Sequence, residues 1–261
     1  MIPLSDENKG REVPYVTYVI IALNVLVFLA ELLHVRAVQY WSMVPLSVIY
    51  DVRVKLAMAP DGHLLVNQYG QLVAQTLPTI GPHPQWLTIF TSMFMHGGFL
   101  HIIGNMWFLW IFGDNLENVL GHVKYAVFYV LCGVAAAVAH ILSNPNSPIP
   151  TLGASGAIAG VLGAYLLLFP GNRVRTLLWI YFFVEIIDVP AVFFLALWFI
   201  GQITGVLGSY TTVGGGIAYW AHIGGFLAGI VLVVLFGGWG AAKRQRGYRP
   251  PRGGRLSRWE E

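Results

Sequence analysis

Long apolar runs, separated by short polar turns, constrain this sequence more than any other feature. The first run, 15–33, is long enough for a helix to cross the hydrocarbon core of a bilayer. Hydrophobic residues make up 56% of the chain and charged residues only 10%, whereas a soluble domain usually carries about 25% charge. We therefore predict an integral, multi-pass membrane protein and exclude a soluble globular fold.

The fold class that these runs predict is an all-α membrane protein with a bundle of six transmembrane helices. The membrane domain covers 15–238, between a polar N-terminal segment, 1–14, and a basic tail, 239–261. We place the six spans at 15–33, 100–116, 122–142, 155–169, 190–208 and 217–237.

The apolar stretch 176–187 does not fit this series, because Glu185, Asp188 and Pro190 lie at its end. We interpret it as an interfacial or re-entrant segment that leads into the fifth span. A short seventh span is the competing interpretation. It would move the basic tail to the other side of the membrane, away from the remaining positive charge.

Loop charges predict the orientation. With six spans, one side of the membrane holds the tail and the basic residues Lys9, Arg11, Lys124, Arg173 and Arg175. Positive loops are retained in the cytoplasm, so both termini should be cytoplasmic, in a protein of the plasma membrane. Seven of the fifteen basic residues lie in the tail, where we expect them to attract anionic lipid rather than nucleic acid. Its prolines and glycines predict that it is mostly disordered.

The first loop, 34–99, is too long for a simple connection. An Asp61-Gly62 turn and several prolines predict short helices or a hairpin, lying at the outer membrane surface. The single cysteine, Cys132, lies within an apolar run, so we interpret it as a small buried side chain.

Unusual polar residues lie near the outer ends of three spans. His101 and Asn105 share a helix face in the second span, Ser155 begins the fourth, and His222 lies about five residues into the sixth. Each alone has an ordinary explanation, because a hydroxyl in a membrane helix usually bonds its own backbone. Their convergence at one depth indicates a functional site.

The fourth span supports this interpretation, because it is short. About fifteen residues of helix cover only about 22 Å of a hydrocarbon core that is about 30 Å thick. Ser155 should therefore lie below the outer surface, in a cavity that water reaches. Small residues at four-residue spacing would let the backbones of the fourth and sixth spans approach each other closely. They are Gly156 and Gly160 in the fourth span, and Ala221, Gly225 and Gly229 in the sixth.

The chemistry that these residues predict is acyl transfer. A neutral histidine can take the proton from a serine hydroxyl and make it a nucleophile. Backbone N–H groups at the helix start, with Asn105 and His101, could stabilise an oxyanion. Acidic residues are absent from the outer ends of the even-numbered spans, so we predict a Ser155–His222 dyad rather than a triad. We expect no metal ion and no cofactor.

Three motifs resemble those of the rhomboid intramembrane serine proteases, over roughly residues 86–237. They are His96-Gly-x-x-x-His101-x-x-x-Asn105, Gly153-Ala-Ser155-Gly156 and Ala221-His222-x-x-Gly225-x-x-x-Gly229. The resemblance implies that Ser155 is the nucleophile and His222 the general base, and that Asn105, His101 and the Ser155 backbone N–H form the oxyanion hole. It also implies that substrate backbone approaches Gly153, that Glu117 ties helix ends together, and that the substrates are transmembrane proteins.

Two positions depart from the family pattern. Leu87 follows Trp86 where the family often has arginine, and Ala159 stands where some members have a tyrosine that stacks on the histidine. His222 must then be held by other packing. The alternative function is a catalytically silent relative that binds transmembrane clients. A transporter is disfavoured, because internal repeats and a polar through-path are not evident.

Overall fold

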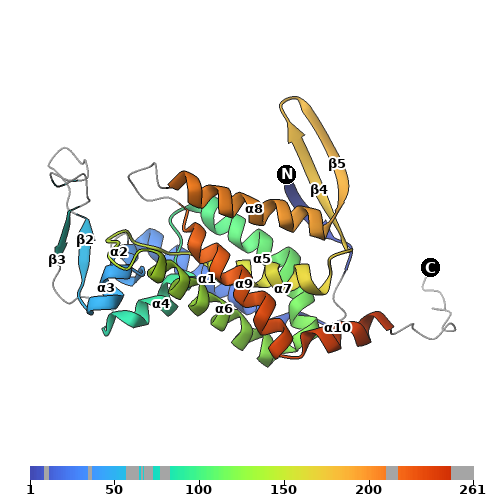
Figure 1. Cartoon of the computed structure of the whole chain (residues 1–261), viewed down its shortest axis with the longest axis horizontal. Coiled ribbons are helices and arrows are strands. Elements are labelled where there is room, and N and C mark those ends of the chain that lie inside the picture. Colours follow the sequence, from blue (N-terminus) through green and yellow to red (C-terminus); the bar gives the residue numbers. More distant parts are fainter. Residues whose placement is uncertain are drawn as a thin grey trace.

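The structure is a computed structural model that describes residues 1–8, 12–34, 37–56, 65, 67, 73–76, 83–209 and 217–247. In this part of the chain, long apolar helices gather in one bundle (Figure 1). Each covers one of the predicted spans: α1 (Tyr15–Leu33), α5 (Phe99–Leu120), α6 (His122–Ser143), α7 (Ser155–Leu168), α8 (Ala191–Ser209) and α9 (Tyr219–Leu235).

Their lengths support part of the membrane prediction. Among the described helices, α1 and α6 are each long and apolar enough to cross a membrane. The helical segments 85–94 and 99–120 would form a third span, bent by 77°, if they act together. The remaining apolar helices, α7, α8 and α9, are shorter. The mostly helical fold with candidate spans is therefore confirmed, while the number of six spans stays a prediction.

Helix α7 forms the centre of the bundle, with nearly all of its side chains buried. It packs against α5, α6 and α9. Gly160 and Gly229 face each other where α7 meets α9, and a Cβ on Gly229 would overlap the backbone of Gly160. Cys132 is fully buried beside this contact, as predicted, and a Cβ on Gly160 would overlap its sulfur. The small residues thus allow backbone contact between these two helices.

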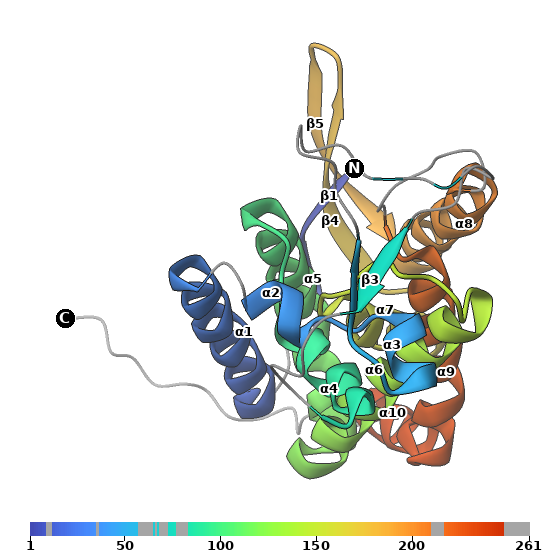
Figure 2. The ribbon, with the colours of Figure 1, turned by 90° about the vertical axis from the view of Figure 1, so that its left-hand side faces the viewer.

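The long first loop contains the short helices that the sequence predicted. They are α2 (Ala37–Trp41), α3 (Pro45–Tyr50), η1 (Gln85–Leu87), α4 (Thr88–Thr91) and η2 (Ser92–Phe94). Strands β2 (Val54–Leu56) and β3 (Ala74–Thr76) pair antiparallel. The expected turn at Asp61-Gly62 lies outside the described residues. Figure 2 shows these elements covering one end of the bundle.

The stretch 176–187, predicted as an interfacial or re-entrant segment, forms β-structure. This stretch belongs to an antiparallel hairpin, β4 (Arg173–Ile180) with β5 (Phe183–Pro190), which projects from the bundle (Figures 1 and 2). It is therefore not a helical seventh span, and the fold is mostly rather than purely α-helical. Side chains at the start of β4 alternate between buried and exposed, as expected for a strand. Val174 and Thr176 are buried, while Arg173 and Arg175 are exposed. Its position relative to the membrane surface stays a prediction.

The N-terminal segment adds a third strand to this hairpin. Strand β1 (Ile2–Asp6) pairs antiparallel with β4, in the order β1-β4-β5. Asp6 accepts hydrogen bonds from the Tyr165 hydroxyl at 2.7 Å and from Asn115 Nδ2 at 2.9 Å. Burial raises the pKa of the Asp6 carboxyl, and these two donors oppose the rise. This strand thereby joins the start of the chain to α5 and α7.

The basic tail begins with a helix. Helix α10 (Gly238–Gly247) follows α9, so the start of the tail is helical, while the expectation that the tail is mostly disordered stays a prediction. Lys243 lies over the ring of Trp239, at 5.6 Å from its centroid. Residues 248–261 lie outside the described part of the chain.

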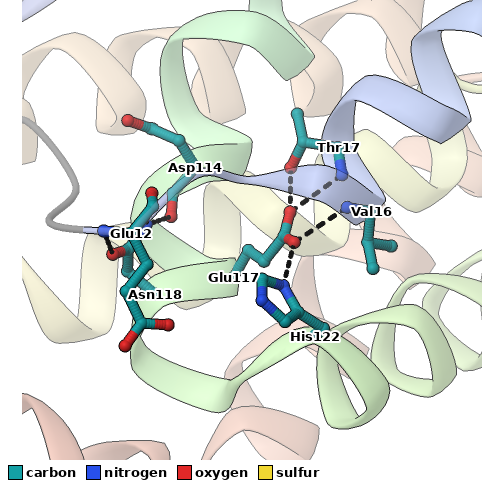
Figure 3. A network of polar contacts seen from close by, with 7 residues as sticks. All are labelled: Glu12, Val16, Thr17, Asp114, Glu117, Asn118 and His122. Atoms are coloured by element: carbon teal, nitrogen blue, oxygen red, sulfur yellow. Dashed lines mark hydrogen bonds and ion pairs between the residues drawn. The ribbon is translucent and has the colours of Figure 1, made fainter.

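Glu117 ties the ends of three helices together (Figure 3). Its carboxylate accepts hydrogen bonds from the backbone N–H groups of Val16 and Thr17, both at 2.8 Å, at the start of α1. The Thr17 hydroxyl donates to it at 2.7 Å, and Nδ1 of His122, the first residue of α6, lies at 2.6 Å. The first N–H groups of a helix lack partners within the helix, so this buried carboxylate caps α1.

Replacing Glu117 with alanine should lower the free energy of unfolding by about 3 kcal/mol, because two backbone donors lose a charged acceptor. The matched variant Glu117→Gln keeps one carbonyl oxygen and should lose less. Titration with a denaturing detergent, followed by circular dichroism, measures both. Equal losses in the two variants would contradict the capping role.

Candidate active site

Ser155 is the first residue of α7, at the end of a loop that other elements hold in place. In that loop, Thr151 exchanges two backbone hydrogen bonds with Met43 of the first loop, at 2.7 and 3.0 Å. The Gly153 N–H donates to the Ser92 carbonyl at 2.8 Å. The first loop and η2 therefore fix the backbone that leads into Ser155.

Ser155 and His222 are in direct contact. His222 Nε2 lies 2.8 Å from Ser155 Oγ, although the two residues are 67 positions apart. Both side chains are partly exposed, so the pair is within reach of another molecule. The contact follows from the close approach of α7 and α9. There, a Cβ on Gly225, one turn after His222, would overlap the carbonyl of Gly156, the residue that follows Ser155.

His101 and Asn105 of α5 lie against the same loop. Gly153 has φ +124°, and a Cβ there would lie 2.8 Å from His101 Cε1 and Nε2 and 3.6 Å from Asn105 Nδ2. Only glycine accepts both this backbone conformation and this close approach. The structure thus brings together the five residues that the sequence singled out: His101, Asn105, Gly153, Ser155 and His222.

His96 orients Asn105, which sequence analysis did not foresee. Asn105 Nδ2 lies 2.9 Å from His96 Nε2, and both side chains are buried. An amide nitrogen can only donate, so His96 Nε2 accepts, and the second amide hydrogen is left for another partner. The His96 backbone N–H in turn lies 3.3 Å from both carboxylate oxygens of Glu31, in α1. Glu31 is the single charged residue in the apolar run 15–33, and that isolated charge was the sequence signal that could have indicated its contact with His96.

Helix α8 supplies two further contacts that the sequence did not reveal. Gln202 Oε1 lies 2.7 Å from His222 Nδ1. The ring of Trp198, one turn earlier, lies 5.8 Å from the His222 ring, centroid to centroid, with 36° between the planes. Trp198 provides the packing expected to replace a tyrosine at Ala159, which is fully buried in the core. Both contacts come from α8, whereas the polar residues that the sequence singled out lie on or directly before α5, α7 and α9.

Comparison with protein families places most of these residues in one domain. The model of the Rhomboid domain matches residues 83–239, which is more than half of the 261-residue chain. The match includes α5 to α9 and the loop before Ser155.

Curated proteins show the same similarity. Rhomboid protein 1, mitochondrial, from Saccharomyces cerevisiae is 29% identical over 177 residues, covering 66% of this chain and 47% of that protein. Rhomboid protease GluP from Bacillus subtilis is 34% identical over 89 residues, covering 34% of this chain and 17% of that protein. Rhomboid-type serine protease 2 from Emericella nidulans is 23% identical over 277 residues, covering 88% and 52%. The chain spans about half or less of the length of these relatives.

Proposed function

Since this chain belongs to the rhomboid family of integral membrane proteins, we propose that it is an intramembrane serine endopeptidase. The reaction is hydrolysis of a peptide bond in or near a transmembrane segment of another membrane protein. The observation that carries the proposal is the 2.8 Å contact between Ser155 Oγ and His222 Nε2, beside a helix N-terminus.

In the first half of the reaction, His222 acts as the general base. Its Nε2 takes the hydroxyl proton while Ser155 Oγ attacks the carbonyl carbon of the scissile bond. The tetrahedral intermediate then collapses, and His222 gives the proton to the leaving amine. The products are an ester on Ser155 and a free amino terminus.

In the second half, water hydrolyses the ester. His222 takes a proton from the water, the hydroxide adds to the ester carbonyl, and Ser155 leaves with the returned proton. The partial exposure of both side chains supports this step, because water must reach them. The enzyme is thereby restored and a carboxylate is released.

Both tetrahedral intermediates carry an oxyanion that needs donors. We assign this role to the Ser155 backbone N–H, to the Asn105 amide and to His101. The start of α7 offers N–H groups without partners inside the helix, together with the positive end of the helix dipole. The close contacts of Gly153 with His101 and Asn105 support their inclusion. Such donors are pre-positioned where charge develops, which makes them more effective than water.

The expected partners are transmembrane protein substrates and the surrounding lipid. Rhomboid proteins act on membrane proteins within the bilayer, and the apolar helices fit that setting. We propose the plasma membrane as the location, and the distribution of loop charge supports cytoplasmic placement of both termini. The mitochondrial name of one relative makes localisation of a tagged chain a direct check.

Incubating the purified protein with a panel of model transmembrane substrates, in liposomes, tests the proposed reaction. We expect wild-type protein to cut at least one of them in or beside its transmembrane segment, and Ser155→Ala to cut none. If wild-type protein bound these substrates without cutting any, the alternative of a catalytically silent client-binding protein would replace the proposal.

A further inference from the structure

Gln202 is the polar side chain of α8 that contacts His222. Its Oε1 lies 2.7 Å from His222 Nδ1, on the side of the ring away from Ser155, which contacts Nε2 at 2.8 Å. Gln202 Nε2 donates to the Trp198 carbonyl at 3.0 Å. Both ends of the amide therefore have partners, and both ring nitrogens of His222 are engaged.

The Trp198 carbonyl determines which way the Gln202 amide points. Oxygen and nitrogen of a glutamine amide look alike in shape, so their assignment rests on the hydrogen bonds that they make. A backbone carbonyl can only accept, so the nitrogen must face Trp198 and the oxygen must face His222. Gln202 Oε1 is then an acceptor, and a neutral His222 must carry its proton on Nδ1.

This assignment decides what the other ring nitrogen can do. A neutral imidazole protonated on Nδ1 has a lone pair on Nε2, which is the atom that faces the Ser155 hydroxyl. The opposite tautomer would place a lone pair against Gln202 Oε1 and an N–H against the hydroxyl. It could not take the serine proton.

Building on the proposed function, we propose that Gln202 is a positioning residue that holds His222 in the tautomer able to act as the base. It is a neutral counterpart of the acidic third residue in soluble serine hydrolases. A carboxylate here would have to lose its hydration inside an apolar bundle, which is costly, whereas an amide needs only its two partners. The Trp198 ring, on the same face of α8, limits rotation of the imidazole.

Replacing Gln202 with leucine removes the acceptor and leaves an apolar side chain of similar size. We expect kcat to fall by about 10- to 100-fold with KM little changed, because the group acts on the base and not on substrate binding. Gln202→Glu keeps an oxygen acceptor and should stay within about tenfold of wild type. The matched control is Thr204→Val on the same helix, which removes an exposed hydroxyl that donates to the Gly201 carbonyl.

Histidine labelled with nitrogen-15 gives a readout that needs no activity. In wild-type protein at neutral pH, NMR should show His222 protonated on Nδ1, and Gln202→Leu should shift it toward a mixture. A dominant Nε2–H form in wild type would overturn the proposal even if the variants failed to fold. The proposal would also be overturned if the kcat of Gln202→Leu were within threefold of the kcat of Thr204→Val. If wild type cut no substrate yet showed the Nδ1–H form, the proposed function would fail and the assignment to Gln202 would stand.

Discussion

Replacing His222 with alanine should lower the rate of cleavage by about 10³-fold or more, because Ser155 then lacks a base. Ser155→Ala should do the same. Since the two residues act as a unit, the double variant should be no slower than either single variant. Initial rates with one reconstituted transmembrane substrate measure all three.

Matched controls separate this effect from general damage. His34→Ala removes an exposed histidine at the end of α1, and Ser143→Ala removes an exposed hydroxyl that donates to the His140 carbonyl. Both should cleave at the wild-type rate. If the double variant lost as much cleavage rate as the two single losses combined, Ser155 and His222 would contribute independently. That result would contradict their roles as a nucleophile and its base.

Replacing Gly229 with alanine should give a large loss of stability. The new Cβ would overlap the backbone carbonyl of Gly160, which cannot rotate away as a side chain can. Helices α7 and α9 must then separate, at a cost of about 3 kcal/mol in the free energy of unfolding. Cleavage should fall as well, because the same two helices carry Ser155 and His222.

Gly104→Ala is the control for this substitution. Gly104 lies within α5, and a Cβ there meets nothing within 4 Å. The change should leave stability unaltered or raise it by about 0.5 to 1 kcal/mol, because alanine favours the helix. Unfolding of both variants in mixed micelles gives the comparison. If Gly229→Ala were as stable as Gly104→Ala, the backbone contact between Gly229 and Gly160 would be contradicted.

The helices were largely predictable, because their apolar runs are long and their ends are marked. The run beginning at Ser155 predicted a short helix that starts at that residue, and α7 is such a helix. Glu117 was expected to tie helix ends together, and it contacts both α1 and α6. The convergence of His101, Asn105, Ser155 and His222 followed from topology, since alternate spans begin on the same side of the membrane.

The hairpin β4–β5 was missed because composition alone cannot distinguish an apolar strand pair from a membrane segment. Its partner strand, β1, lies more than 160 residues away in sequence, and pairing at that distance leaves no local pattern. The contact between Gln202 and His222 was missed for a related reason. The rotation of α8 about its axis decides whether Gln202 faces the site or the lipid, and an almost uniformly apolar helix does not encode that rotation clearly.

Covalent labelling tests most directly the central claim that Ser155 is a nucleophile activated by His222. A fluorophosphonate reacts with an activated serine and leaves an adduct that mass spectrometry can locate. We predict a stoichiometric adduct on Ser155 in folded wild-type protein, strongly reduced in His222→Ala and unaltered in His34→Ala. An adduct that forms equally well without His222, or no adduct on Ser155 in protein shown to be folded, would contradict the account.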